Sequence, residues 1–412
     1  MKKLLVSIGV VLIGASLIGA SLVGCSSTAS TATTTALQKQ TILIGTDSPL
    51  TGQAAGWGLG VEHGVQLAFQ DVNAAGGLTI GNINYTFKVV SLDDQYDMAT
   101  AVNNIRTLVN TDGCKYIFTF QPDSAVAVAP ELATEKVIQF TVSEPDAVIQ
   151  QPQNATTFRT FVPASMQAPS YVAWIAKNYP NVHTTDIITG MDLNGNTGIA
   201  ATSNACKQAG ITVDTVVQYT DGTMDFTPFI TKLMADNPDM ISIPEVGSGD
   251  CASIIKTLRD SGYKGVISAE SKPGASDIVG VTGEADIEGV ICDDLALIAP
   301  QASTIALALP AREVAKWGSS YSDTYDFYTQ ATLMFTAMQR ANSVDTTAVK
   351  NILQDPTQSW PYVALTGATA KFDGTTAQAL YGANATNQIS CPYGISVIHN
   401  GQDTVAGIVS IP

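Results

Sequence analysis

Histidine is scarce in this chain of 412 residues, which has only three, at positions 63, 183 and 399. None belongs to an HExxH run or stands beside residues spaced as metal ligands, so the sequence predicts neither a metal site nor a catalytic histidine. A GxSxG segment, the usual turn of a serine hydrolase, is absent. Carboxylates are plentiful, yet no spacing singles out an acid/base pair, and nothing favours a glycosidase. We therefore expect neither an enzyme nor a bound cofactor.

Basic residues are also few. The chain has 20 Lys and Arg against 36 Asp and Glu, which gives a net charge of −16 and a pI of about 4.4. Such a surface repels phosphate backbones, so we expect no nucleic-acid partner. The acidity supports solubility without identifying a ligand. The length and the hydrophobic content of 45% suffice for two lobes, at roughly 100–200 residues per domain.

The amino terminus carries a targeting signal. Lys2 and Lys3 precede an apolar run over residues 4–23, and small residues lie just before Cys25. A positive start, an apolar middle and a small residue before the cut are typical of a secretory signal over residues 1–24. The alternative is a membrane-spanning anchor, because the run is close to the ~20 residues that cross a bilayer. The ending LVGC resembles a bacterial lipoprotein box, which implies a lipidated Cys25, and residues 25–40 would be its flexible tether. Either way, we expect the body of the protein outside the cytoplasmic membrane.

Five cysteines follow Cys25, and none belongs to a CxxC or Cys/His run. An exported compartment permits disulfides, but the odd number leaves at least one thiol unpaired. We expect most of them to be isolated buried thiols. A disulfide between Cys206 and Cys251 stays open as an alternative.

The stretch over residues 41–77 reads as a strand, a loop and a helix. Residues 41–44 are apolar enough for a buried strand, and a loop rich in Gly, Pro, Ser and Thr follows. A helix is predicted from Gly58 to the turn at residues 73–77, where glycine accepts the left-handed closing conformation. One face of that helix carries Val61, Val65, Ala68 and Val72. The loop therefore lies at the carboxyl end of a strand, where open α/β sheets bind ligands.

Strand and helix signals alternate along the rest of the chain. Strands are predicted over residues 85–89, 116–120, 137–142, 186–189, 211–219, 240–243, 266–268, 289–292, 393–398 and 404–411. Helices are predicted over residues 102–109, from residue 121, after a loop at 192–197, and over 226–235, 251–261, 321–340 and 346–353. Asp123 or Ser124 is expected to cap the helix that starts at residue 121. The alternation indicates an α/β protein with parallel sheets covered on both faces.

Several motifs together carry a family resemblance. They are PLTG at residues 49–52, Trp57, DVNAAGG at 71–77, VVSLDD at 89–94 and DFTPF at 225–229. Over nearly all of residues 41–412 the chain resembles the leucine/isoleucine/valine-binding family of ABC-transporter solute-binding proteins. The resemblance implies two doubly wound parallel-sheet lobes joined by three crossover segments (the type I periplasmic binding fold).

The same resemblance implies discontinuous lobes and a cleft between them. Lobe I would comprise residues 41–162 and 296–365, and lobe II residues 163–295 and 366–412. Closure of the lobes over a small solute, which an ABC permease then receives, is the implied mechanism. A sensor of the same fold and an exported hydrolase are the alternatives. The glycines at 56, 58, 60 and 64 lack the GxGxxG spacing, so a dinucleotide site is not expected.

The resemblance also implies binding residues. In the family, hydroxyl and amide groups after the third and fourth strands hold an amino-acid carboxylate, an acid of lobe II holds the ammonium, and an aromatic ring packs on the side chain. The matching or nearby positions are Trp57, Asp123, Ser124, Thr141, Ser143, Asn194, Glu245 and Glu270. Asn194 and Glu245 stand near positions where amino-acid binders carry tyrosines, which weighs against leucine-like ligands.

Each of these positions also has a structural alternative. Asp123 would only cap its helix, Ser124 would be exposed helix surface, and Thr141 would satisfy a strand end. Trp57 would fill the edge between the lobes, and the glutamates would be solvated rim charges.

The charges near the expected cleft bear on the ligand. The carboxylates are those of Asp123, Glu144, Asp192, Glu245 and Glu270. They would repel an anionic solute unless a cation offsets them, and Lys272 and Arg159 are the nearby candidates. We therefore expect a solute that bears an amine, such as an amino acid, an amide or a small amine. An aromatic or other small carboxylate is the alternative.

Overall fold

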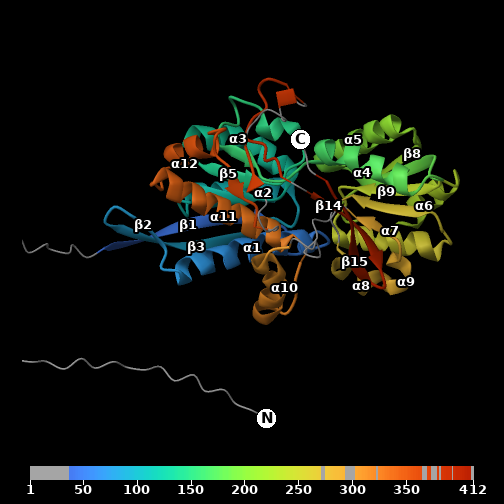
Figure 1. The fold of residues 1–412 in the computed structure, drawn as a ribbon, viewed down its shortest axis with the longest axis horizontal. Coiled ribbons are helices and arrows are strands. Elements are labelled where there is room, and N and C mark those ends of the chain that lie inside the picture. Colours follow the sequence, from blue (N-terminus) through green and yellow to red (C-terminus); the bar gives the residue numbers. More distant parts are fainter. Residues whose placement is uncertain are drawn as a thin grey trace, which may run out of the picture. The chain divides into compact units, whose positions relative to one another are not determined.

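The computed structural model describes residues 37–270, 274–292, 302–321, 323–363, 369–372, 378–379, 382–391 and 393–409. These residues form two doubly wound lobes, each built around its own mainly parallel sheet (Figure 1). The predicted α/β class with two parallel-sheet lobes is therefore confirmed. The predicted signal segment, the lipidated Cys25 and Lys272 lie outside the described residues, and the predicted lobe boundaries remain predictions.

Lobe I contains a six-stranded sheet in the order β2-β3-β1-β4-β5-β6, in which only the β2–β3 pair is antiparallel. Its strands are β1 (Gln38–Ser48), β2 (Leu78–Ile80), β3 (Ile83–Asp93), β4 (Tyr116–Thr119), β5 (Ile138–Thr141) and β6 (Thr157–Arg159). Every side chain of β4 and β5 is buried, as expected of central parallel strands covered on both faces.

The helices that follow these strands cover the sheet. They are α1 (Ala55–Ala74), α2 (Met98–Asn110), α3 (Pro122–Glu135) and the short 3-10 helix η1 (Asp146–Ile149). Helix α1 buries the face predicted from the sequence, because Val61 and Val65 are fully buried. The cap of α3 was predicted wrongly. Gln121, the residue just before the helix, is the cap: its side-chain oxygen accepts the Ser124 N–H at 2.6 Å. A cap must precede the free N–H groups of the first turn, and Asp123 and Ser124 already lie within that turn.

Lobe II contains a seven-stranded sheet in the order β15-β14-β11-β10-β9-β7-β8. Its strands are β7 (Thr184–Gly190), β8 (Thr212–Tyr219), β9 (Met240–Pro244), β10 (Val266–Glu270), β11 (Ile291–Cys292), β14 (Tyr393–His399) and β15 (Gln402–Val409). Its helices are α4 (Ala164–Asn178), α5 (Leu193–Ala209), α6 (Thr227–Met234), α7 (Ser248–Asp260), α8 (Ala275–Thr282) and α9 (Glu284–Ile287). The last two strands pair antiparallel at one edge, and the others run parallel.

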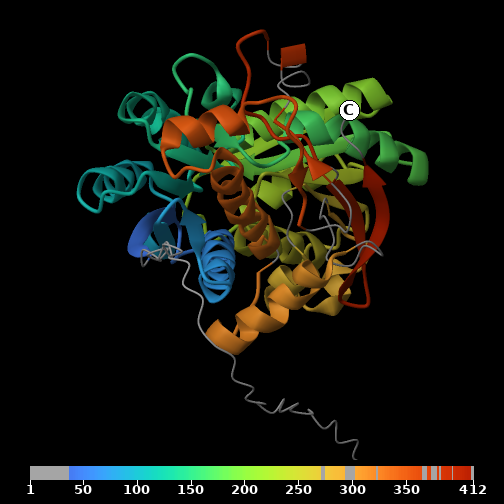
Figure 2. The ribbon, with the colours of Figure 1, turned by 60° about the vertical axis from the view of Figure 1, so that its left-hand side comes forward.

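Between β11 and β14 the chain returns to lobe I. The elements of this return are α10 (Thr304–Trp317), α11 (Thr324–Ala341), α12 (Thr346–Leu353), β12 (Trp360–Pro361) and β13 (Thr369–Ala370). Helix α11 packs closely along α1, as Figure 2 shows. Gly64 of α1 permits this approach, since a Cβ added there would lie 2.4 Å from the carbonyl oxygen of Thr324. The amino-terminal turn of α11 is thereby fixed against lobe I.

Three local predictions need correction. Residues 192–197 are not a loop: α5 already begins at Leu193, because Asp192 caps it by accepting the Gly195 N–H at 2.7 Å. The predicted tether runs to residue 40, but Gln38, Lys39 and Gln40 already pair with β3. Helices α4 and α10 were not predicted, and each contains an interior proline that interrupts the helical pattern.

All five described cysteines are buried, and Cys114, Cys206 and Cys251 are free thiols. The possible disulfide between Cys206 and Cys251 is therefore wrong, and the expectation that most of the cysteines are isolated buried thiols is confirmed for Cys114, Cys206 and Cys251. Burial raises the pKa of Cys206 to about 12, and repulsion from Glu270 adds to the shift. Since the thiolate is the reactive form, we expect this thiol to be inert.

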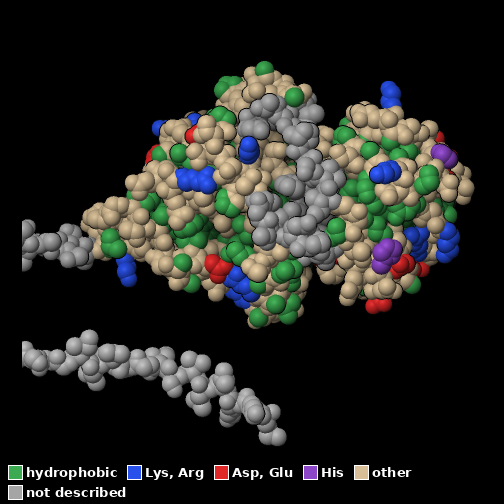
Figure 3. Space-filling model, viewed as in Figure 1, with side chains coloured by type: hydrophobic (Ala, Val, Ile, Leu, Met, Phe, Trp, Pro, Cys, Tyr) green, Lys and Arg blue, Asp and Glu red, His purple; other side chains and the backbone are tan. Residues whose placement is uncertain are grey.

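The charged side chains that the structure describes do not form one large patch on the face drawn in Figure 3. On the face drawn in Figure 3, Lys and Arg side chains lie in small separate groups. Within the described part of the chain, no helix combines the length and the apolar character needed to cross a membrane.

Candidate functional site

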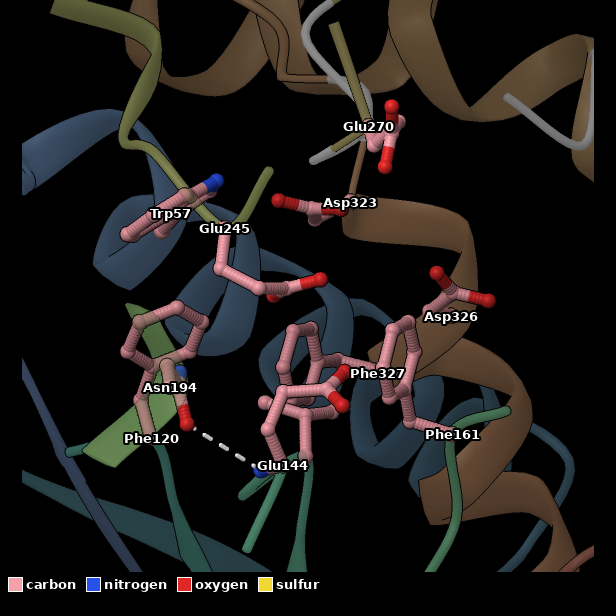
Figure 4. A pocket seen from close by; sticks show the side chains of 11 residues that line it. Trp57, Phe120, Glu144, Phe161, Asn194, Glu245, Glu270, Asp323, Asp326 and Phe327 are labelled. Atoms are coloured by element: carbon pink, nitrogen blue, oxygen red, sulfur yellow. Dashed lines mark hydrogen bonds between the residues drawn. The ribbon is translucent and has the colours of Figure 1, made fainter. Parts of the chain in front are cut away.

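A pocket with an empty volume of about 500 Å³ lies between the two lobes, where strands of both sheets end (Figure 4). Its lining residues are Trp57, Phe120, Val142, Glu144, Phe161, Asn194, Glu245, Glu270, Asp323, Asp326 and Phe327. Asn194, Glu245 and Glu270 come from lobe II, and the others come from lobe I or from α11. The pocket is therefore completed only by both lobes together.

Aromatic rings form much of the wall. Trp57 of α1 packs on Phe120, which follows β4, with ring centroids 5.2 Å apart. Gly247 lies behind the indole, because a Cβ added there would be 3.4 Å from the ring. Phe161 and Phe327 also border the cavity in Figure 4. The pocket thus offers both apolar surface and the negative faces of rings, which attract cations.

Glu270, the last residue of β10, is held by hydroxyl groups. Its Oε2 accepts the Thr202 hydroxyl at 2.5 Å, and its Oε1 accepts the Ser268 hydroxyl at 2.9 Å. Burial raises the pKa of this carboxyl above its ordinary value, while the hydroxyl hydrogen bonds oppose the shift. Glu270 is therefore an immobilised acid at the lobe II side of the pocket.

Glu245 follows β9 with an unusual backbone. Its φ is +54°, in the left-handed region that costs a non-glycine residue about 1–3 kcal/mol. Gly198 of α5 leaves room for its side chain, since a Cβ there would lie 2.9 Å from the Glu245 Cγ. Figure 4 shows the carboxylate extending below Trp57 into the cavity. Because β9 and β10 are neighbours, with Glu270 paired to Pro244, Glu245 and Glu270 leave the sheet at the same edge.

Two hydrogen bonds connect the lobes beside the pocket. The Glu144 N–H donates to Asn194 Oδ1 at 3.2 Å, as the dashed line in Figure 4 marks. The Tyr96 hydroxyl donates to Asp192 Oδ2 at 2.8 Å. Asp192 also caps α5, so the second bond ties lobe I directly to a helix start of lobe II.

Negative charge dominates the lining. The carboxylates are those of Glu144, Glu245, Glu270, Asp323 and Asp326, and no Lys, Arg or His of the described ranges lines the pocket. Arg159, one of the two candidate cations, is fully buried and lies 3.1 Å from Asp146, and it also donates to the Glu144 carbonyl and to Gln388. Arg159 therefore does not line the pocket, but it holds the backbone of Glu144, which does. A single lysine such as Lys272 would offset at most one of the five carboxylates.

The structure brings together four of the residues predicted from the sequence, namely Trp57, Asn194, Glu245 and Glu270. Thr141 and Ser143 do not line the pocket, because successive residues of an extended chain point to opposite sides and Val142 and Glu144 take the pocket side. The Ser143 hydroxyl instead donates to the Pro122 carbonyl at 3.1 Å, and Thr141 Oγ1 accepts the Ser143 N–H at 3.1 Å.

Asp123 and Ser124 do not line the pocket either. The Ser124 side chain is fully buried, not exposed helix surface, and its hydroxyl donates to the Gln121 carbonyl at 2.9 Å. Asp123 Oδ2 accepts the Gln121 side-chain amide at 3.1 Å. Both side chains thus make hydrogen bonds within the start of α3.

Several lining residues were missed by sequence reasoning. Phe120 and Val142 directly follow apolar strand runs, so their position at a strand end was a usable signal. Asp323, Asp326 and Phe327 lie at the start of α11, and no local motif ties that helix to the strand ends of lobe I.

The described residues offer no constellation for metal binding, since they contain no group of three or more His, Cys, Asp or Glu side chains arranged to hold a metal ion. None of the three histidines lines the pocket. His63 is buried, lies 2.7 Å from Glu313 and stacks on Trp317, so it serves the packing of α1 against α10.

Comparisons with known proteins agree with this architecture. A curated leucine-, isoleucine-, valine-, threonine- and alanine-binding protein of Pseudomonas aeruginosa is 24% identical over 261 residues, which span 62% of this chain and 67% of the relative. A branched-chain amino acid ABC transporter protein of Thermus thermophilus, solved with bound valine, superposes with a TM-score of 0.77 at 14% identity. The superposition covers 91% of this chain and 97% of the Thermus chain. A solute-binding protein of Rhodopseudomonas palustris BisB5, solved with 3,4-dihydroxybenzoic acid, gives a TM-score of 0.74 at 16% identity, over 90% of this chain and 98% of its own.

The sequence profile described as periplasmic binding protein matches residues 41–388. This match spans both lobes and most of the chain, and it confirms the resemblance drawn from the sequence motifs. The chain belongs to the periplasmic binding protein family.

Proposed function

We propose that this protein is the extracytoplasmic solute-binding component of an ABC importer and that it captures a small amino compound between its lobes. The solute is an amino acid, an amide or an amine. Binding and closure are the whole of the activity, and no bond is made or broken.

The single observation that carries this proposal is the charge of the pocket. Five carboxylates and four aromatic rings line it, without a described basic side chain. An ammonium group entering such a site gains charge-assisted hydrogen bonds and contact with ring faces, whereas a plain carboxylate meets repulsion. Closure of the lobes removes the solute and the pocket from water, so each polar group left without a hydrogen bond costs about 1–3 kcal/mol. This cost favours solutes that donate a hydrogen bond to the immobilised Glu270 carboxylate.

The relatives support both solute classes. The Pseudomonas relative is named for leucine, isoleucine, valine, threonine and alanine, and the Rhodopseudomonas structure holds 3,4-dihydroxybenzoic acid. The aromatic wall is the one feature that favours an aromatic carboxylate here, and the carboxylate lining opposes it.

Isothermal titration calorimetry against matched sets tests the proposal. One set contains amino acids, amino-acid amides and alkylamines, and the other contains benzoate and hydroxybenzoates. We expect binding in the first set only, and loss of that binding in Glu270→Gln. Glu284→Gln, which removes an exposed carboxylate of α9, serves as the control. Tight binding of a carboxylate, with no binding of any amine, would reject the proposal.

The attachment to the membrane is a second part of the proposal. Cys25 would carry the lipid, and residues after it would connect the anchor to β1. In a bacterial host, the full-length chain should partition into a detergent phase, and Cys25→Ser should move it to the aqueous phase. Equal partitioning of the two forms would refute lipidation at this residue.

An uptake assay distinguishes a transport protein, which delivers its solute to a permease, from a sensor of the same fold. Cells that lack the protein should lose uptake of a labelled solute identified by calorimetry. Unchanged uptake together with a lost transcriptional response would favour the sensor.

A further inference from the structure

A buried glutamine continues the face of α11 that lines the pocket. Gln330 is 2% exposed, and neither its side-chain oxygen nor its side-chain nitrogen has a hydrogen-bond partner among the described residues. Buried amide groups are almost always paired, because an unpaired one loses its hydrogen bonds to water and gains none in return. The buried hydroxyl groups of Thr324, Tyr328 and Thr329 on the same helix follow this rule, since they donate hydrogen bonds at 2.7, 2.7 and 2.8 Å. Gln330 is therefore a polar group that lacks its partner.

Helix geometry directs this amide toward the pocket. Gln330 follows Phe327 by three residues and Asp326 by four, so the three side chains share one face of α11. Asp323, Asp326 and Phe327 line the pocket, and Figure 4 shows them in this order along one side of the cavity. Long helical side chains lean toward the amino-terminal end of their helix, which here is the end at the pocket. One helical turn is about 5.4 Å, a length that a glutamine side chain nearly spans. The amide of Gln330 is therefore the next polar group along this wall.

The packing of α11 holds the amide in this position. A Cβ added at Gly64 of α1 would lie 2.4 Å from the Thr324 carbonyl oxygen and 2.8 Å from the Tyr328 nitrogen, so the two helices are in close contact. The hydroxyl groups of Thr324 and Tyr328 also bind Glu313 and Asp71 outside α11. A rotation of α11 that took Gln330 to another partner would break these contacts. A solute would therefore meet a preorganised amide.

The chemistry of the amide defines the group that would pair with it. A glutamine side chain offers one acceptor oxygen and two N–H donors. A carboxamide has the same set, so two hydrogen bonds can form side by side and satisfy both atoms. A carboxylate can pair only with the N–H groups, and an ammonium group only with the oxygen. In Figure 4, Glu270 borders the upper part of the cavity and Phe327 the lower part, so a solute with its ammonium beside Glu270 can direct its other end along α11.

We propose that the solute is an amino compound with a carboxamide group, whose ammonium binds beside Glu270 and whose carboxamide pairs with the side-chain amide of Gln330. This inference rests on the proposed function and narrows it from amino compounds in general to amino amides. Gln330 is then a specificity-determining residue that extends the pocket by one turn of α11.

Calorimetry with compounds that differ only in one end group tests the inference. The probes are the carboxamide, the methyl ester and the free acid of the same amino acid, for glycine, alanine, valine and leucine, together with ω-amino carboxamides and their methyl esters. The ester keeps the ammonium and the size of the amide but has no N–H to donate to Gln330. We expect the best amide to bind about tenfold or more tightly than its ester, because the ester leaves the Gln330 oxygen unpaired. The free acid leaves the same oxygen unpaired and should also bind more weakly than the amide.

Two variants assign the preference to this side chain. Gln330→Met keeps the length of the side chain and removes both polar atoms, so the advantage of the amide over the ester should fall below about threefold. Binding of the ester should persist in Gln330→Met, which also shows that the variant is folded. Gln339→Met makes the same exchange at an exposed position of α11 and should leave the advantage unchanged.

The outcomes separate this inference from the proposed function. If every ester binds as tightly as its amide in the wild type, a water molecule or nothing pairs with Gln330, and the inference is overturned while the proposed function stands. The same holds if Gln330→Met keeps the preference for the amide. If no amino compound binds, both fall.

Discussion

Replacing Asp47 by asparagine should flatten the pH dependence of the unfolding free energy. Asp47 lies near the end of β1 and Asp94 directly after β3, and both side chains are fully buried. Asn104 donates to Asp47 Oδ1 at 2.9 Å, but the Oδ2 atoms of both aspartates have no hydrogen-bond partner among the residues that the structure describes. Burial, followed by repulsion from Asp94, raises the pKa of Asp47 to about 8, and burial raises the pKa of Asp94 to about 7.

The sign of the pH dependence follows from the number of protons that the folded and unfolded states bind. Between pH 4 and pH 8 the folded protein keeps the Asp47 proton that the unfolded chain releases, so the unfolding free energy falls as the pH rises through this range. At about 1.4 kcal/mol for each unit of pKa shift, Asp47 alone removes about 3 kcal/mol of stability between pH 5 and pH 8. Asparagine keeps the acceptor for Asn104 and does not titrate. Its buried amide, if unpaired, would cost about 1–3 kcal/mol at every pH.

Urea denaturation followed by circular dichroism at pH 5, 6, 7 and 8 measures this difference. The wild-type stability should fall by about 3 kcal/mol more than that of Asp47→Asn between the two ends of the range. Asp214→Asn, which removes an exposed carboxylate of β8, should follow the wild type. Parallel curves for the wild type and Asp47→Asn would refute the reasoning, because they would mean that Asp47 stays ionised in the folded protein.

Other predictions follow from close approaches and from one hydrogen bond. Gly198→Ala places a Cβ 2.9 Å from the Glu245 Cγ, so amine affinity should fall about tenfold by calorimetry, whereas Gly280→Ala, which meets nothing within 4 Å, should leave it unchanged. Tyr96→Phe removes the hydroxyl bond to the α5 cap but keeps the ring, and we expect a loss of about fivefold in affinity, with unaltered affinity as the contrary result. Gly64→Ala meets the α11 backbone at 2.4 Å and should lower the unfolding free energy by about 1–3 kcal/mol in urea, and an unchanged midpoint would contradict the packing of α1 on α11.

Much of the fold could be predicted because parallel strands leave a plain signal. β4 and β5 are buried on both faces, so their sequences are short apolar runs bounded by polar residues. The amphipathic face of α1 was equally readable. Helix α10 was not, because Pro310 stands inside it and its polarity does not follow its burial: Leu307 and Val314 are exposed, whereas Glu313 is buried.

The site could be predicted only in part, for two physical reasons. Strand ends mark which residues reach the cleft, and this located Trp57, Asn194, Glu245 and Glu270. The orientation of single side chains depends on register, and a shift of one residue exchanges Thr141 and Ser143 for Val142 and Glu144. The contribution of α11 depends on tertiary packing through Gly64, which no local pattern encodes.

Native mass spectrometry of the protein purified without added ligand tests the central claim most directly. The account predicts a retained small molecule that is cationic at neutral pH, is released on unfolding and is absent from Glu270→Gln. Identification of the retained molecule as an aromatic or aliphatic carboxylate without an amine would contradict it.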